Sequence, residues 1–102
     1  MVLELADLHG TRWEGLEALV DTGSTFTAVP RAILEGLCVR PVRRQPFELA
    51  TGQVVESDVG DALVRVQGQQ VPTPVIFAEP GEQSLLGAVT LESLLLAVDP
   101  VH

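Results

Sequence analysis

The chain has 102 residues, 46% of them hydrophobic, and carries fourteen acidic against six basic residues, which gives a formal net charge of -8. A chain of this length can bury one modest core, so we expect residues 1–102 to form a single domain. All six basic residues are arginines, too few to build a broad cationic surface. The composition therefore excludes nucleic acid and anionic membranes as expected partners.

The N-terminal residues, the apolar runs and the cysteine count indicate the cellular compartment in which we expect the protein. Residues 1–7 carry acids where a signal peptide would need bases, and no apolar run approaches the roughly 20 residues of a membrane span. Cys38 is the only cysteine, so an internal disulfide is impossible. We therefore expect a soluble cytoplasmic protein, with Cys38 as a small buried hydrophobic residue between Leu37 and Val39.

In the N-terminal part of the chain, strands alternate with turns. The expected elements are a strand near residues 3–5, a turn at 7–10, a strand over 16–20 with one buried face, a strand over 26–29 and a helix from Pro30 to about Leu37.

The remaining pattern is β up to residue 78 and helical near the end. It predicts hairpin arms at 47–50 and 53–55, a second arm reaching 66 with a bulge near Gly60, a strand over 71–78, a short buried strand at 85–86 and a helix over 88–96. Pro72 and Pro74 lack N–H donors, so one side of their strand should be an edge. The predicted fold class is mostly β with one or two short helices.

One short segment carries the chemistry. Asp21-Thr22-Gly23-Ser24-Thr25 follows directly on the apolar run at 18–20. This order places a carboxylate at the end of a buried strand, on a tight turn whose glycine lets another backbone approach. Asp-Thr-Gly occurs by chance in about 2% of chains this long, so its context must decide. The alternative is a plain turn whose carboxylate accepts local N–H groups.

The context resembles the retropepsin-like aspartic proteases. Leu85-Leu86-Gly87 opens an apolar helix about sixty residues after the Asp21 turn, and the resemblance extends over about residues 16–96. It implies a closed β-barrel of the type that forms half of an acid protease. Because the chain has a single Asp-Thr-Gly copy, the resemblance also implies a homodimer as the active form.

The resemblance assigns the residues of the turn. Asp21 of each chain would be catalytic, one copy as general base on a water and the other as general acid. Thr22 would bond its mate across the two-fold axis, Gly23 would expose backbone groups to substrate, and Ser24 would donate its hydroxyl to Asp21. Some retroviral members also pair an acid after this turn with an arginine after the Leu-Leu-Gly element; Thr25 and Ala88 stand there, so that brace is missing.

Two further elements receive roles by the resemblance. The hairpin tip would be the flap that closes on substrate, with Leu49, Ala50, Thr51 and Gly52 as its residues. Leu85, Leu86 and Gly87 would pack behind the catalytic turn. The substrate would be an extended peptide that binds as an added strand. No cofactor and no metal is expected, since His9 and His102 lie far apart without a pattern of metal ligands.

The functional prediction is an aspartic endopeptidase that hydrolyses peptide bonds with a water held between two Asp21 carboxylates. The principal alternative is a non-catalytic module of the same fold, which captures extended peptides or serves for dimerisation. A third is an isolated domain whose activity depends on other chain segments.

Overall fold

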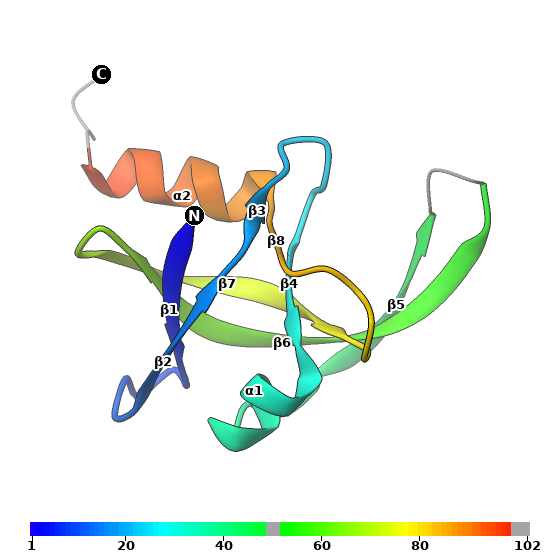
Figure 1. Cartoon of the computed structure of the whole chain (residues 1–102), viewed down its shortest axis with the longest axis horizontal. Helices are drawn as coiled ribbons and strands as arrows, with labels where there is room; N and C mark the ends of the chain where they lie inside the picture. The colour runs from blue at the N-terminus through cyan, green and yellow to red at the C-terminus, as the bar shows by residue number, and fades with distance from the viewer. Residues whose placement is uncertain (49–51, 99–102) are drawn as a thin grey trace.

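The computed structural model describes residues 1–48 and 52–98. The fold is mostly β with two short helices, as predicted (Figure 1). Its elements in chain order are β1 (Val2–Ala6), β2 (Trp13–Glu17), β3 (Leu19–Val20), β4 (Thr27–Pro30), α1 (Arg31–Gly36), β5 (Arg43–Glu48), β6 (Val54–Val66), β7 (Gln69–Ala78), β8 (Leu85–Leu86) and α2 (Ala88–Val98).

The described strands form one curled sheet with the order β2-β1-β6-β7-β4-β8-β3, and β5 pairs with β6 beside this path. The two end strands of the path, β2 and β3, are separated in the chain by Ala18 alone. The N–H of Ala18 donates to the Met1 carbonyl at 2.9 Å, and the N-terminal ammonium donates to the Ala18 carbonyl at 2.8 Å. The sheet therefore turns back on itself at Ala18 and forms a half-barrel.

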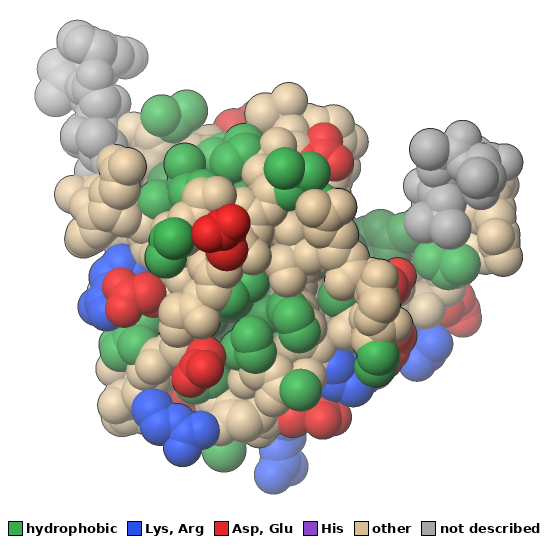
Figure 2. Space-filling model, in the orientation of Figure 1, with side chains coloured by type: hydrophobic (Ala, Val, Ile, Leu, Met, Phe, Trp, Pro, Cys, Tyr) green, Lys and Arg blue, Asp and Glu red, His purple; other side chains and the backbone are tan. Residues whose placement is uncertain are grey.

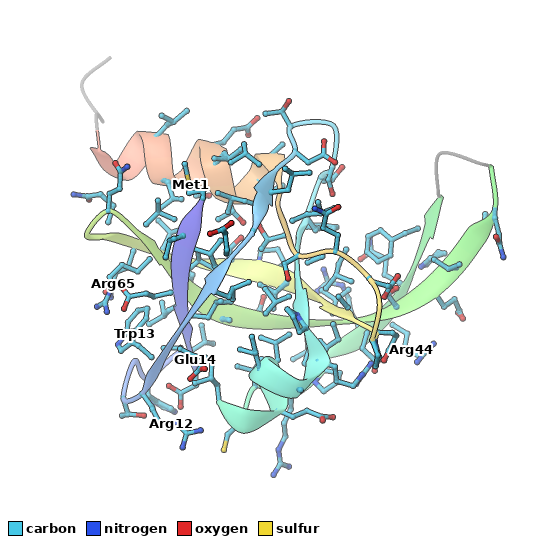
Figure 3. The ribbon with its side chains drawn as sticks, in the orientation of Figure 1. Met1, Arg12, Trp13, Glu14, Arg44 and Arg65 are labelled. Carbon is cyan, nitrogen blue, oxygen red and sulfur yellow. The ribbon has the colours of Figure 1, made fainter. Side chains whose placement is uncertain are left out.

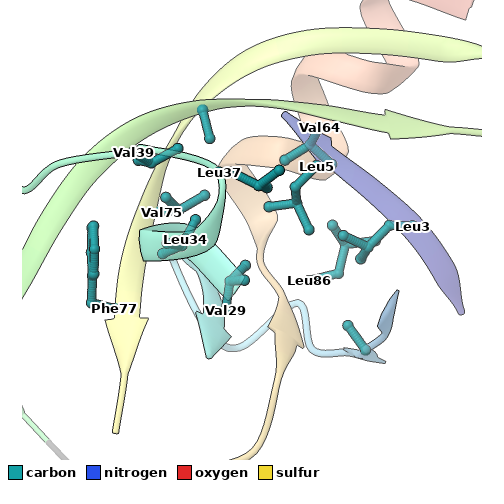
Figure 4. Packing of buried hydrophobic residues seen from close by; sticks show 12 residues of the cluster. Leu3, Leu5, Val29, Leu34, Leu37, Val39, Val64, Val75, Phe77 and Leu86 are labelled. Atoms are coloured by element: carbon teal, nitrogen blue, oxygen red, sulfur yellow. The ribbon is translucent and has the colours of Figure 1, made fainter. Parts of the chain in front are cut away.

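Alternating side chains fill the inside of this half-barrel. Along β7, for example, Val71, Thr73, Val75 and Phe77 are buried while residues between them are more exposed, the period-two pattern of a strand. Figure 4 shows the buried side chains from β1, β4, α1, β6, β7 and β8 converging on one core. Each fully buried large aliphatic side chain stabilises the fold by about 1.5–3 kcal/mol.

The strand predicted over 16–20 is two strands. β2 pairs with β1 as far as Glu17, and β3 pairs in parallel with β8 at Leu19 and Val20. The predicted buried face holds for Ala18 but not for Val20, which is 43% exposed, beside Leu19 at 54%. The Asp21 turn therefore follows an apolar strand that the single chain leaves partly uncovered.

Gly60 serves a close contact and not the predicted bulge. The pairing of β6 with β5 and then with β7 continues without an extra residue through this position. A Cβ on Gly60 would lie 2.8 Å from the Arg40 carbonyl oxygen and 3.1 Å from the Phe77 ring. The glycine therefore allows the chain after α1 to cross close to β6.

Cys38 is exposed, so the prediction that it is buried was wrong. The end of α1 explains this. Cys38 has a φ of 62°, its N–H donates to Glu35, and the N–H of Val39 donates back to Leu34. This is the left-handed helix ending in which the residue after the C-cap turns outward and the next one packs inward. Val39 is the residue that is buried.

The prolines of β7 lie where the sequence predicted an edge. Pro72 and Pro74 pair with β6 on one side, whereas β4 joins β7 only from Val75 onward. The helix α2 packs against β7 and β4. The missing N–H groups of the two prolines therefore remove no bond to β4.

Candidate active site

The Asp21 turn is fixed by backbone hydrogen bonds. The N–H of Asp21 donates to the Leu86 carbonyl at 3.0 Å, which continues the β3–β8 pairing into the turn. The N–H of Ser24 donates to the Asp21 carbonyl at 3.1 Å. The Asp21 side chain is half-buried, while Thr22 and Gly23 are exposed. The turn thus presents its first three residues at the surface.

The carboxylate of Asp21 also makes a local bond. The N–H of Gly23 donates to Oδ1 of Asp21 at 3.0 Å. This is the Asx-type bond of the plain-turn alternative. The same residue also lines a cleft. The bond from Gly23 therefore orients the Asp21 carboxylate and leaves it open to the cleft.

The Ser24 hydroxyl does not play its predicted role. It donates to the carbonyl oxygen of Phe26 at 3.1 Å, two residues on. A hydroxyl has one proton, so this local bond uses the donor expected for Asp21. Ser24 braces the loop that leads into β4.

Gly87 lies directly behind the turn. A Cβ at this position would lie 2.5 Å from both the carbonyl carbon and the carbonyl oxygen of Phe26, and 3.0 Å from the Ser24 oxygen. Real side chains cannot approach backbone so closely. The Leu85-Leu86-Gly87 element therefore needs its glycine so that β8 and the Asp21 turn can touch.

The start of α2 holds the turn through backbone bonds. The N–H groups of Ala88 and Val89 donate to the carbonyls of Ser24 and Thr25 at 2.8 and 3.0 Å. The first N–H groups of a helix have no partner within it, so they are available for such bonds. Thr25 and Ala88 cannot form an ion pair, as the sequence indicated, and main-chain bonds at these two positions join the same segments.

Three buried threonines lie beneath this contact. The Thr90 hydroxyl oxygen is 2.7 Å from that of Thr27 and 2.9 Å from that of Thr73. Thr27 also accepts the N–H of Gly87 at 3.0 Å. The cluster joins β4, β7 and α2 under the turn, and sequence reasoning missed it, because a lone threonine has no motif that marks it as buried.

A cleft of about 610 Å³ opens beside Asp21. This size is typical of ligand sites. Its walls come from the Asp21 turn, the end of β5, the start of β6, the end of β7 and the loop before β8. The polar side chains along it belong to Asp21, Ser24, Thr25, Ser57, Glu82 and Gln83.

Both arms of the hairpin that was predicted to form the flap are present. β5 and β6 form an antiparallel hairpin that projects from the body of the molecule (Figure 1). Phe47 and Val55, opposite each other in this hairpin, line the cleft. Leu49, Ala50 and Thr51 lie outside the described residues. Gly52 is exposed and has a φ of 86°, a conformation that favours glycine.

An aromatic contact joins the hairpin to the turn. The rings of Phe26 and Phe47 meet edge to face with their centroids 5.8 Å apart. This geometry is a favourable one for aromatic pairs. Sequence reasoning placed both residues in strands but missed the contact, because no local pattern relates residues so far apart in the chain.

A cluster of charges lies next to the cleft, outside its lining residues. Nη2 of Arg31 lies 2.8 Å from carboxylate oxygens of both Asp58 and Glu79, and Arg44 lies 3.0 Å from Asp58. Hydrogen bonding to Arg31 lowers the pKa of both Asp58 and Glu79 and raises the pKa of Arg31. Asp58 follows the cleft residue Ser57, and Glu79 begins the loop that leads to Glu82. The cluster was not foreseen from the sequence.

Neither a metal site nor a membrane-spanning helix is found within residues 1–48 and 52–98. This part of the chain contains no group of three or more His, Cys, Asp or Glu side chains placed to hold a metal ion. Nor does it contain a helix long and apolar enough to cross a membrane.

Comparison with known proteins gives matches at the level of structure. Models of protein families give no match, and neither do curated protein sequences. The solution structure of the simian foamy virus (mac) protease is similar, with a TM-score of 0.62 and 30% identity over 93% of this chain and 96% of that one. The EIAV protease in complex with the inhibitor HBY-793 has a TM-score of 0.67 and 20% identity, over 92% of this chain and 85% of that one.

Proposed function

Because the chain belongs to the retropepsin-like aspartic protease family, we propose that it is an aspartic endopeptidase, with residues 1–102 as one catalytic domain. The observation that carries this proposal is the position of Asp21. Its carboxylate lines the cleft, in a turn that β8 and α2 hold by main-chain bonds. If the turn were only structural, its carboxylate would not need to lie in a cleft.

The proposed active form is a homodimer, because each chain supplies one Asp21. The surface around the turn supports this. Thr22 and Gly23 are exposed, and Leu19 and Val20 just before them leave apolar area uncovered. Figure 2 shows hydrophobic side chains gathered at the surface near β3 and α2. A second copy that brings its own Asp21 to the cleft would cover this surface.

The proposed chemistry follows from two carboxylates in one place. Two like charges a few ångströms apart cannot both ionise easily, so the pair shares a proton. The ionised Asp21 takes a proton from a water as this water attacks the peptide carbonyl carbon. The protonated Asp21 donates to the carbonyl oxygen. In a symmetric dimer either copy can take either role, and the pair has two apparent pKa values.

The proposed substrate is an extended peptide. The cleft has a volume of about 610 Å³, and the β5–β6 hairpin borders it with Phe47 and Val55. Closure of the hairpin over the peptide would exclude water from the reacting groups. The apolar lining would receive apolar side chains on either side of the cleaved bond.

The test compares the wild-type chain with Asp21→Asn on a library of unstructured peptides, read by mass spectrometry. Asn keeps the shape of Asp but can act neither as base nor as acid. We expect cleavage by the wild type only, with free energies of unfolding that agree to within about 1 kcal/mol between the two proteins. Equal cleavage by both proteins would reject Asp21 as the catalytic residue. Peptide binding without cleavage by either would favour the non-catalytic module.

A further inference from the structure

We propose that Glu82 makes the cleft select extended peptides with a lysine or arginine near the cleaved bond and reject peptides with an acidic residue there. The inference rests on the proposed function, since it concerns the substrate of the same cleft. The preference for a basic residue adds to the preference for apolar side chains, which the rest of the cleft lining suits.

The charges along the cleft are unbalanced. Most lining residues are apolar, and among the described lining residues the only charged side chains are the carboxylates of Asp21 and Glu82. No arginine or histidine lines the cleft in the described part of the chain. In the proposed mechanism Asp21 is engaged with water and with its mate. Glu82 is therefore the carboxylate that remains for a substrate side chain.

The loop before β8 holds Glu82 in place and leaves its charge available. The N–H of Glu79 donates to Oε1 of Glu82 at 2.6 Å, which orients the carboxylate. Glu79 itself is paired with Arg31 at 2.8 Å. Within the described residues, no arginine lies within ion-pair distance of Glu82, which is exposed. Of two acids in one loop, one is neutralised and the other faces the cleft.

The expected size of the preference follows from this exposure. Exposed ion pairs contribute little, so a lysine beside Glu82 should improve binding by only about two- to five-fold over a neutral isostere. A glutamate at the same place should weaken binding by a similar factor, since like charges repel. In the proposed symmetric dimer, Glu82 is present on both sides of the dyad. A basic residue should therefore be favoured on either side of the cleaved bond.

The test uses ten-residue peptides with one apolar centre, in which lysine, norleucine or glutamate is placed in turn at each flanking position. Binding of fluorescent peptides to Asp21→Asn is measured by polarisation, and cleavage by the Asp21 protein is measured as kcat/KM. Both are repeated with Glu82→Gln, which keeps the oxygen that accepts the Glu79 N–H. The matched control is Glu14→Gln, which removes the same charge from β2, outside the lining of the cleft (Figure 3).

At one or more positions, we expect peptides with lysine to bind more tightly and to have a higher kcat/KM than peptides with norleucine. Peptides with norleucine should in turn exceed those with glutamate in both quantities. Glu82→Gln should remove this order and Glu14→Gln should keep it, at an ionic strength that screens the overall charge of the chain. Cleavage without the order, or an order that survives Glu82→Gln, would overturn the inference and leave the proposed function intact. Binding with the order but without cleavage would reject the protease and keep the inference. If no peptide binds and none is cleaved, both are wrong.

Discussion

The hydroxyl oxygens of Thr27 and Thr90 lie 2.7 Å apart in the protein interior, although 63 positions separate the two residues in the chain. The Thr27 hydroxyl also accepts a hydrogen bond from the N–H of Gly87, which lies directly behind the Asp21 turn. Both residues are fully buried. The position of the turn therefore depends on a polar contact between β4 and α2, beneath the surface that carries Asp21.

The first prediction tests this contact. Thr90→Val keeps the shape of the side chain but leaves the hydroxyls of Thr27 and Thr73 without their shared partner. An unsatisfied buried polar group costs about 1–3 kcal/mol, so the free energy of unfolding should fall by that amount. Thr90→Ser, which keeps the hydroxyl, should lose less. Urea denaturation measures both, and equal stability of Thr90→Val and wild type would show that the cluster contributes nothing.

A second prediction concerns Gly87. Gly87→Ala would place a methyl group 2.5 Å from the backbone of Phe26, so the turn or β8 must move. We expect a loss of about 1–3 kcal/mol in unfolding free energy and a large loss of peptide cleavage. Gly15→Ala on β2 is the control, since its Cβ would meet the nearest atom, the Leu3 oxygen, only at 3.9 Å. If both variants behave alike, the close approach at Gly87 is not what the turn requires.

The third prediction is a dependence of stability on pH through Arg31. Arg31 lowers the pKa of Asp58 and Glu79 in the folded state, so both acids bind protons more readily when unfolded. Their contribution to stability is therefore present above their ordinary pKa values, about 4, and is lost as the pH falls through the lowered folded values.

Arg31→Met should accordingly be less stable than wild type at pH 6, and the difference should shrink below about pH 4. Urea midpoints over this range measure it. Arg43→Met serves as the control, because Nε of Arg43 donates a hydrogen bond to Oε1 of Gln45, which is an amide and not a carboxylate. A difference that stays constant with pH would mean that Arg31 stabilises the fold by packing alone.

The fourth prediction follows from one Asp21 per chain. Specific activity should fall on dilution as the proposed dimers dissociate. Thr22→Ala should shift this fall to higher protein concentration, since Thr22 is exposed beside Asp21 and is the side chain proposed to bond its mate. Activity assays and sedimentation over the same concentrations provide the check. A fully active species that sediments as a monomer would contradict the shared site.

The sequence alone determined most of the order of the elements and the place of the Asp21 turn. The family resemblance placed Gly87 behind the turn, where its close contact with Phe26 is found. Local periodicity located most strands to within a few residues and α2 to within two residues of its end. These features depend on neighbours in the chain, where alternation and turn residues carry the information. The hairpin of β5 and β6 was located in the same way.

Only the tertiary structure decided what each side chain meets. It exposed Val20 and Cys38 and directed the Ser24 hydroxyl to Phe26. It also paired Arg31 with Asp58 of β6 and with Glu79 of the loop after β7. Glu79 received Arg31 as its partner, whereas Glu82, three residues later, lines the cleft with no arginine within ion-pair distance among residues 1–48 and 52–98. Each outcome depends on which strands pair and how the sheet curls, and no pattern along the chain encodes contacts between segments that only folding brings together.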